Sequence, residues 1–239
     1  MSIGGLTPAG VPVQSRDVVG AVRTVTVGTP YLVLWANYGS LTDLAAVLAD
    51  DPRLADRLWG TVAAGPLDDG RGGGAERPHF GSDPGAAAAV VGVLRQPSSE
   101  ARDPRAARGR MLPPSLITAE PEQFAIGARS TLRRLLAALD APVWAALLAA
   151  HLDRWFAQGH AVSLQYAALT VADALGRGFI DVDRERVLVD GAGRVRLDPN
   201  GSEMLVTYSV DHVLFLDWLE RQLREAGFSR DADRGGPPV

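Results

Sequence analysis

Residues 179–197 read FIDVDRERVLVDGAGRVRL, and their apolar side chains follow the period of a β-strand rather than that of a helix. Two runs, 179–183 and 186–190, alternate apolar and polar residues or are rich in β-branched ones, as strands are. The sequence Asp-Gly-Ala-Gly at 190–193 is typical of a tight hairpin turn. Residues 194–197 alternate again and predict the partner strand. This stretch therefore predicts an antiparallel hairpin in the C-terminal half of the chain.

The segments around this hairpin have the helical period. Three helices are expected before it, over 124–139, 142–158 and 161–177, because apolar side chains recur there every three or four residues. After a short strand at 204–208, a last helix is expected from about residue 211 to Gly227. The resulting prediction is an α+β fold that is predominantly helical, with a small antiparallel sheet in the C-terminal half.

The N-terminal half predicts further helices and one strand. The apolar run at 31–35 predicts a buried strand that is isolated in this half or joins the small sheet. Ser40 precedes a helical pattern at 41–48, and Asp51-Pro52 is a typical start for a second helix carrying Leu54, Leu58, Trp59 and Val62 on one face. An alanine-rich helix is expected at 85–94.

The composition suggests four segments along the chain. Residues 1–95 are expected to form a helical region with one or two strands, and 96–114 a linker rich in proline and arginine. Residues 115–228 are expected to form the helical and hairpin domain. The polar stretch 229–239 is expected to be a disordered tail.

The composition also excludes several kinds of chemistry. The 239 residues contain no cysteine, and every basic residue is an arginine, so thiol nucleophiles and Schiff-base lysines are excluded. The net charge is −4, which argues against nucleic acid as a partner. No apolar run reaches the roughly 20 residues that a membrane span needs. We expect a cytoplasmic protein without a cofactor.

Carboxylates on the first predicted strand are candidate catalytic groups. Asp181 and Asp183 are two residues apart, so they share one face of a strand, and close carboxylates can act as an acid and a base. The alternative is that both side chains face solvent on an edge strand. The sequence leaves both interpretations open.

Residues 179–201 resemble, in outline, the catalytic loop and following hairpin of protein-kinase-like phosphotransferases. The resemblance places Asp181 at the catalytic aspartate and Asp198 near the metal-binding aspartate, with Gly201 after it. It implies a phosphotransferase activity. The sequence departs from the family at Phe179, where a histidine is expected, and at Arg186, where an asparagine is expected. It also has no lysine for the nucleotide phosphates.

Aromatic and histidine side chains in the C-terminal half predict a ligand pocket between helices. Packing in the core explains the aromatic residues equally well. The histidine spacing does not predict a metal site, because Gly159 interrupts the helix between His151 and His160. The candidate pocket residues are Trp144, His151, Trp155, His160, Tyr166 and His212.

Two functions are compatible with these features. The first is a non-catalytic binding or accessory protein that contacts a protein partner through a helical surface, which the shortage of catalytic motifs favours. The second is a small-molecule enzyme that uses aspartate and histidine acid–base chemistry, including a degenerate kinase-like phosphotransferase. The sequence leaves the oligomeric state open.

Overall fold

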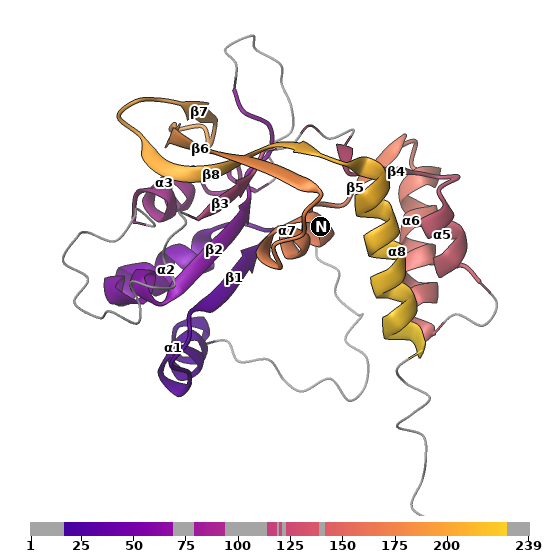
Figure 1. Ribbon diagram of the computed structural model, residues 1–239, viewed down its shortest axis with the longest axis horizontal. Helices are drawn as coiled ribbons and strands as arrows, with labels where there is room; N and C mark the ends of the chain where they lie inside the picture. Colours follow the sequence, from indigo (N-terminus) through magenta and orange to yellow (C-terminus); the bar gives the residue numbers. More distant parts are fainter. Residues whose placement is uncertain are drawn as a thin grey trace, which may run out of the picture.

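A six-stranded mixed sheet with the order β1-β2-β3-β8-β6-β7 dominates the computed structural model (Figure 1). The structure describes residues 17–68, 79–93, 114–118, 120, 123–138 and 142–228. Four neighbouring strands are parallel: β1 (Val33–Asn37), β2 (Leu58–Ala63), β3 (Ser115–Ile117) and β8 (Ser202–Val210). β6 (Ile180–Val189) pairs antiparallel with β8, and β7 (Val195–Leu197) pairs antiparallel with β6.

Helical segments connect the parallel strands, as a parallel arrangement requires. β1 leads through α2 (Thr42–Asp50) and the 3-10 helix η1 (Pro52–Asp56) to β2, and α3 (Pro84–Val93) lies between β2 and β3 in the chain. α1 (Val18–Gly28) precedes β1. The predicted helix at 41–48 is confirmed, because α2 buries the apolar face that the pattern indicated.

The second helix predicted in the N-terminal half is wrong. Asp51 caps only the short 3-10 helix, by accepting from the Arg53 amide at 3.2 Å, and the chain then enters β2. Leu58 and Val62 lie on one face of a strand, where their separation of four residues fits the period of two as well as that of a helix. A strand covered on both faces is apolar throughout, so periodicity alone did not separate the two structures.

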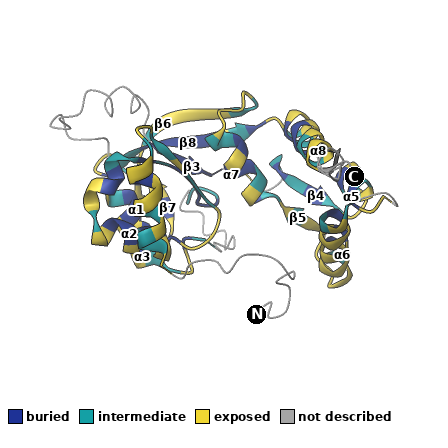
Figure 2. Cartoon of the chain, turned by 90° about the horizontal axis from the view of Figure 1, so that it is seen from below, coloured by how far each residue is buried: buried dark blue, intermediate teal, exposed yellow. Residues whose placement is uncertain are grey.

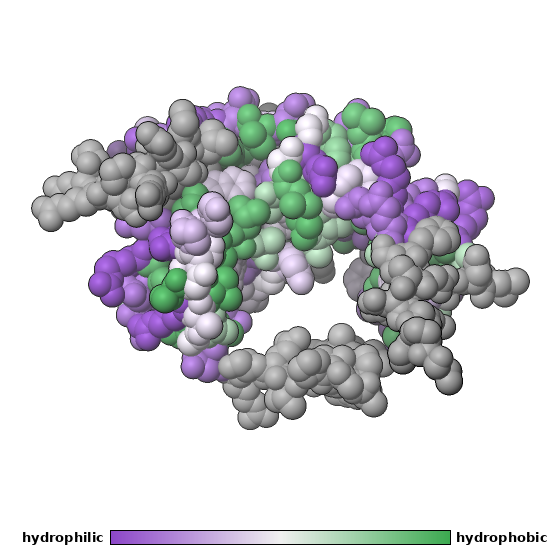
Figure 3. Space-filling view, turned by 60° about the horizontal axis from the view of Figure 1, so that its bottom comes forward, coloured by the Kyte–Doolittle hydropathy of each residue, from purple (hydrophilic) through white to green (hydrophobic). Residues whose placement is uncertain are grey.

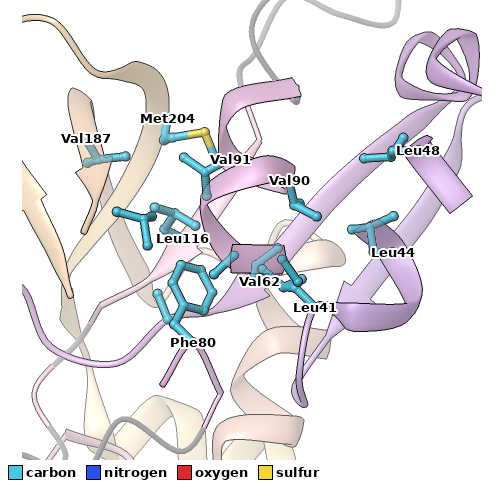
Figure 4. Close-up of a cluster of buried hydrophobic side chains, with 14 of the residues drawn as sticks. Leu41, Leu44, Leu48, Val62, Phe80, Val90, Val91, Leu116, Val187 and Met204 are labelled. Atoms are coloured by element: carbon cyan, nitrogen blue, oxygen red, sulfur yellow. The ribbon is translucent and has the colours of Figure 1, made fainter. Parts of the chain in front are cut away.

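Helices cover both faces of the sheet and make two apolar cores. One core joins α2, α3 and the side chains of β2, β3, β6 and β8 that point toward them, with Phe80 and Val62 fully buried (Figure 4). The other joins α7 (Tyr166–Ala174) and α8 (His212–Phe228) to the opposite face, around Ile117 and Leu169. Buried residues follow the strands and the helix faces turned toward them (Figure 2). The sheet is therefore the middle of three layers.

The C-terminal half contains more strand than expected. The predicted helix over 124–139 is a strand, β4 (Ala125–Gly127), followed by a short helix, α5 (Thr131–Leu136), which Ser130 caps. The predicted helix over 161–177 likewise begins with β5 (Val162–Leu164), which pairs antiparallel with β4, before α7. The helix expected over 142–158 is confirmed as α6 (Val143–Ala157), and Gly159 follows it with φ +91°.

The predicted fold class is wrong. The chain is not predominantly helical with a small C-terminal sheet; it has an α/β fold whose sheet takes β1 and β2 from the N-terminal half and the other four strands from the C-terminal half. The expected hairpin at 186–197 is confirmed as β6 and β7, but it is the antiparallel edge of a larger sheet. β3 is only three residues long, too short for a periodic signal.

Several predicted features lie outside the described residues. These are the linker, apart from Pro114, whose carbonyl accepts from the Leu205 amide at 2.8 Å, and the C-terminal tail. Within the described part of the chain, no helix has the length and apolarity that crossing a membrane requires.

Candidate active site

The carboxyl ends of the four parallel strands form the edge where an open α/β sheet usually binds its ligand. β1 ends at Asn37, β2 is followed by Gly65, β3 by Thr118 and β8 by Asp211. In Figure 1, β1 and β2 point toward α7 and the helical end of the molecule. The face seen in Figure 3 is hollowed between the two ends of the molecule. We therefore examined the polar and aromatic side chains along this edge.

Three aromatic rings meet at the end of β2. Tyr166, the first residue of α7, packs edge-on against Phe124 with ring centroids 4.6 Å apart, and His79 packs edge-on against Tyr166 at 5.1 Å. Gly65 has φ +88°, and a β-carbon there would lie 3.9 Å from the Tyr166 hydroxyl. The chain thus turns sharply after β2 beside the phenol.

Both polar rings of this group are neutral at pH 7. Burial raises the pKa of Tyr166 to about 12, and the charge of Glu120 contributes to the rise. Burial lowers the pKa of His79 below its usual 6.5. The Nε2 atom of His79 is buried and makes no hydrogen bond to the described part of the chain. Since such atoms are normally paired, this nitrogen is available to a ligand.

Packing and hydrogen bonds fix the segment that carries His79. Phe80 is fully buried beside Leu41 and Val62 (Figure 4). The carbonyl of His79 accepts from the Ser82 hydroxyl at 2.7 Å. Asp83 then caps α3 by accepting from the Ala86 amide at 3.0 Å, and it also accepts from the Thr42 hydroxyl of α2 at 2.6 Å. These two bonds lower the pKa of Asp83, with the Thr42 hydroxyl as the larger cause.

A pocket of about 510 Å³ lies at the end of β1, beside this segment. The indole of Trp35 donates to the Asn37 side chain at 3.3 Å, and the Asn37 amide donates to the Gly39 carbonyl at 2.7 Å. Its lining residues are Trp35, Ala36, Asn37, Tyr38, Gly39, Ser40, Thr42 and Asp43. Aromatic and polar groups are therefore combined in one pocket at the ligand-binding edge of the sheet.

The candidate carboxylates are not brought together. Asp181 accepts from the Ser209 hydroxyl at 2.6 Å near the start of β6, whereas the Asp198 amide bonds to the Arg186 carbonyl farther along the same strand. Five residues of strand separate these positions, roughly 16 Å. Asp181 and Asp183 are both exposed.

Asp198 lines a second pocket, of about 520 Å³, between β6 and β7. The charged groups around it pair with one another: Asp198 with Arg196 at 3.1 Å, and Arg184 with Glu203 at 3.2 Å. Neither pairing brings Asp198 toward the edge where the parallel strands end. The arrangement therefore lacks the catalytic and metal-binding aspartate pair that the kinase resemblance implied.

The six predicted pocket residues are spread over three places. Tyr166 belongs to the aromatic group at the end of β2, and His212 Nδ1 lies 3.1 Å from the Gln123 carbonyl at the start of α8. Trp155 and His160 stack face to face at 3.6 Å on the surface. Trp144 packs against the core and His151 is exposed. These side chains line no common pocket among those found.

Sequence reasoning missed His79, Glu120, Tyr38 and Asp43 as site residues. Each follows or lies near the end of a parallel strand, which is the signal that would have found them. That signal depends on recognising β2 and β3 as strands. No group of three or more histidine, aspartate or glutamate side chains suited to a metal ion occurs within the described ranges.

A mostly buried carboxyl lies beneath the same sheet. Asp173 of α7 accepts from the Thr61 hydroxyl of β2 at 2.9 Å. Burial raises the pKa of Asp173, and the hydroxyls of Ser115 and Thr61 offset only part of the effect. The folded chain therefore holds this proton more tightly than the unfolded chain, so stability falls as the pH rises from about 4 through the raised pKa.

Replacing Asp173 with asparagine is expected to stabilise the protein at pH 7, because it removes a charge that burial disfavours. A gain of about 1 kcal/mol corresponds to a rise of roughly 2–4 °C in Tm for a chain of this size. The gain should shrink toward pH 4, where the native carboxyl is protonated. Thermal unfolding followed by circular dichroism across this range measures it, and a lower Tm at pH 7 would show that the charged form is stabilised instead.

With this geometry established, the fold can be compared with known structures. An inosine-uridine preferring nucleoside hydrolase from Bacillus anthracis superposes with a TM-score of 0.60 at 18% identity, over 89% of this chain and 67% of that one. The chain has the nucleoside hydrolase fold. A plant nucleoside hydrolase gives 0.63 at 16% identity over 92% and 71%, and an inosine-guanosine nucleoside hydrolase gives 0.65 at 17% over 86% and 67%.

This chain spans about two thirds of the length of those hydrolases. No protein-family model matches it, and no curated protein matches its sequence. At 15–18% identity the likeness establishes the fold and not the activity.

The comparisons correct the predicted function. The expectations of a non-catalytic accessory protein and of a kinase-like enzyme both depended on a helical architecture that the chain does not have. The solved structures that share its nucleoside hydrolase fold are enzymes that act on small molecules. Both expectations are therefore wrong, and the comparisons give no support to a protein partner.

Proposed function

We propose that this chain is a small-molecule hydrolase whose substrate is a nucleoside or a close chemical relative. The substrate binds at the carboxyl edge of the parallel strands, between the aromatic group at the end of β2 and the pocket at the end of β1. The proposal is supported by the shared fold with hydrolases whose substrates are inosine, guanosine and other nucleosides.

One observation carries the location of the site. His79 Nε2 is buried and unpaired within the described residues, and its ring packs against Tyr166 at the edge where α/β sheets bind ligands. An unpaired buried nitrogen costs about 1–3 kcal/mol of stability, which a ligand hydroxyl or ring nitrogen would recover by bonding to it.

The residues of this edge suit hydrolysis in different ways. Glu120 is exposed, and its carboxylate can accept a proton from water as that water attacks the carbon bearing the leaving group. The bond to the leaving group then breaks, and that group takes up a proton from solvent. His79 and Tyr166, both neutral, position the substrate by hydrogen bonding and ring packing.

Incubation with inosine, guanosine and uridine tests the proposal, with free base and free ribose measured by chromatography. We expect the native chain to release both products in equal amounts. Glu120→Gln should lower the rate about 100-fold, which is within the range for loss of a general base. Glu220→Gln, a matched change two turns along α8, should leave the rate unchanged.

Two outcomes would overturn this function. One is a native chain that releases no base from any of the three nucleosides. The other is a Glu120→Gln variant that is as active as the native chain, which would remove Glu120 from the mechanism.

A further inference from the structure

The pocket at the end of β1 has most of its polar groups already engaged. Asn37 bonds to Trp35 and Gly39, and the hydroxyls of Ser40 and Thr42 lie 2.6 Å apart. Thr42 also donates to Asp83. These bonds fix the walls of the pocket and leave its engaged groups little freedom to bind anything else.

Two lining side chains remain available. Asp43 makes no ion pair or side-chain hydrogen bond with the rest of the described chain, and its carboxylate is exposed. The Tyr38 ring is 54% exposed, and its hydroxyl likewise has no partner in the described ranges. A large aromatic ring and a carboxylate with no internal role therefore border the same 510 Å³ pocket.

We infer that this pocket binds a flat ring that carries two adjacent hydrogen-bond donors. The Tyr38 ring provides a stacking surface, and the two oxygens of Asp43 accept the two donors side by side. The volume lies within the range of small-molecule sites, about 300–1,000 Å³. This inference rests on the proposed function, and it names Tyr38 and Asp43 as the residues that determine specificity.

Two parts of a nucleoside present such a pair of donors. One is the vicinal diol of ribose, and the other is the ring N–H and neighbouring amino group of guanine. In either case the rest of the molecule would extend toward His79, because the Thr42–Asp83 bond joins the pocket wall to the segment that carries His79.

Isothermal titration calorimetry with guanosine, inosine and 2′-deoxyguanosine tests this site and separates the two sources. Asp43→Asn should weaken guanosine binding at least tenfold, because it replaces one charged acceptor oxygen with a donor. If the carboxylate reads the base, the native chain prefers guanosine over inosine and Asp43→Asn loses that preference. If it reads the sugar, the lost preference is the one for guanosine over 2′-deoxyguanosine.

Asp43 also lies in the first turn of α2, where a carboxylate stabilises a helix by about 0.3–1 kcal/mol. Each variant is therefore compared at a temperature where circular dichroism shows it fully folded. Tyr38→Leu provides a second test, since it removes the stacking ring and keeps Asp43. Asp217→Asn on the exposed face of α8 is the matched control and should bind as the native chain does.

Native-like affinity in both Asp43→Asn and Tyr38→Leu would overturn the pocket, as would a native chain that binds none of the three ligands. Binding that depends on Asp43 without release of free base would overturn the proposed hydrolase activity and leave the pocket standing. Full activity in Asp43→Asn, with native-like KM, would do the reverse.

Discussion

Replacing Phe80 with alanine is expected to lower the free energy of unfolding by about 3–5 kcal/mol. The ring is fully buried among Leu41, Val62 and Leu116, in the core between the sheet and the helices α2 and α3 (Figure 4). Removing it leaves a cavity that rigid neighbours from several elements cannot fill. Because Phe80 follows His79 directly, the change should also loosen the segment that carries the candidate ligand-binding ring.

Urea unfolding followed by tryptophan fluorescence measures this loss. Phe80→Leu keeps most of the apolar volume and should cost less than half as much. Tyr31→Ala, which removes an aromatic ring that is 76% exposed, should change stability by less than about 0.5 kcal/mol. An equal effect of Phe80→Ala and Tyr31→Ala would contradict the packing described here.

The second large effect is expected at Gly201, in the turn between β7 and β8. A β-carbon at this position would lie 2.2 Å from the carbonyl oxygen of Val187 and 2.4 Å from its carbonyl carbon. Both atoms belong to the backbone of β6, so the contact cannot be relieved by a side-chain rotation. Gly201→Ala should therefore cost about 3 kcal/mol or more, because the turn and the strand must move apart.

Gly191→Ala is the matched control in the neighbouring turn between β6 and β7. A β-carbon there meets nothing within 4 Å, and the backbone angle is not in the left-handed region. We expect this control to unfold within about 0.5 kcal/mol of the native chain. The same urea titration applied to both variants should separate their midpoints clearly, and coinciding midpoints would show that β6 is free to move.

The sequence predicted the elements with long, regular patterns. The helix α6 is bounded by Pro142 and Gly159, and the β6–β7 hairpin is marked by the turn at 190–193; both signals are local. β2 was read as a helix because a strand buried on both faces has no alternation, and β3 was too short to detect. Without these two strands, the parallel sheet was invisible.

The errors about the site follow from the errors about the sheet. Tyr166 was named as a pocket residue from its aromatic character, but its partner His79 belongs to a segment with no periodic signal. Their meeting depends on where β2 and α7 are placed by strand pairing across the chain. Asp181 and Asp198 drew attention because they lie on a hairpin that is easy to recognise, and the structure keeps them well apart.

The strand order also constrains how the chain acquires its structure during synthesis. Two central strands, β3 and β8, are parallel neighbours, with Ser115 paired to Leu205. The middle of the sheet therefore stays incomplete until nearly all of the described chain has left the ribosome. Contacts between residues so distant in sequence slow folding, and they expose apolar strand surface in the meantime. The nascent N-terminal half, with β1 and β2 at one edge, is thus the stage at which this protein depends most on chaperones.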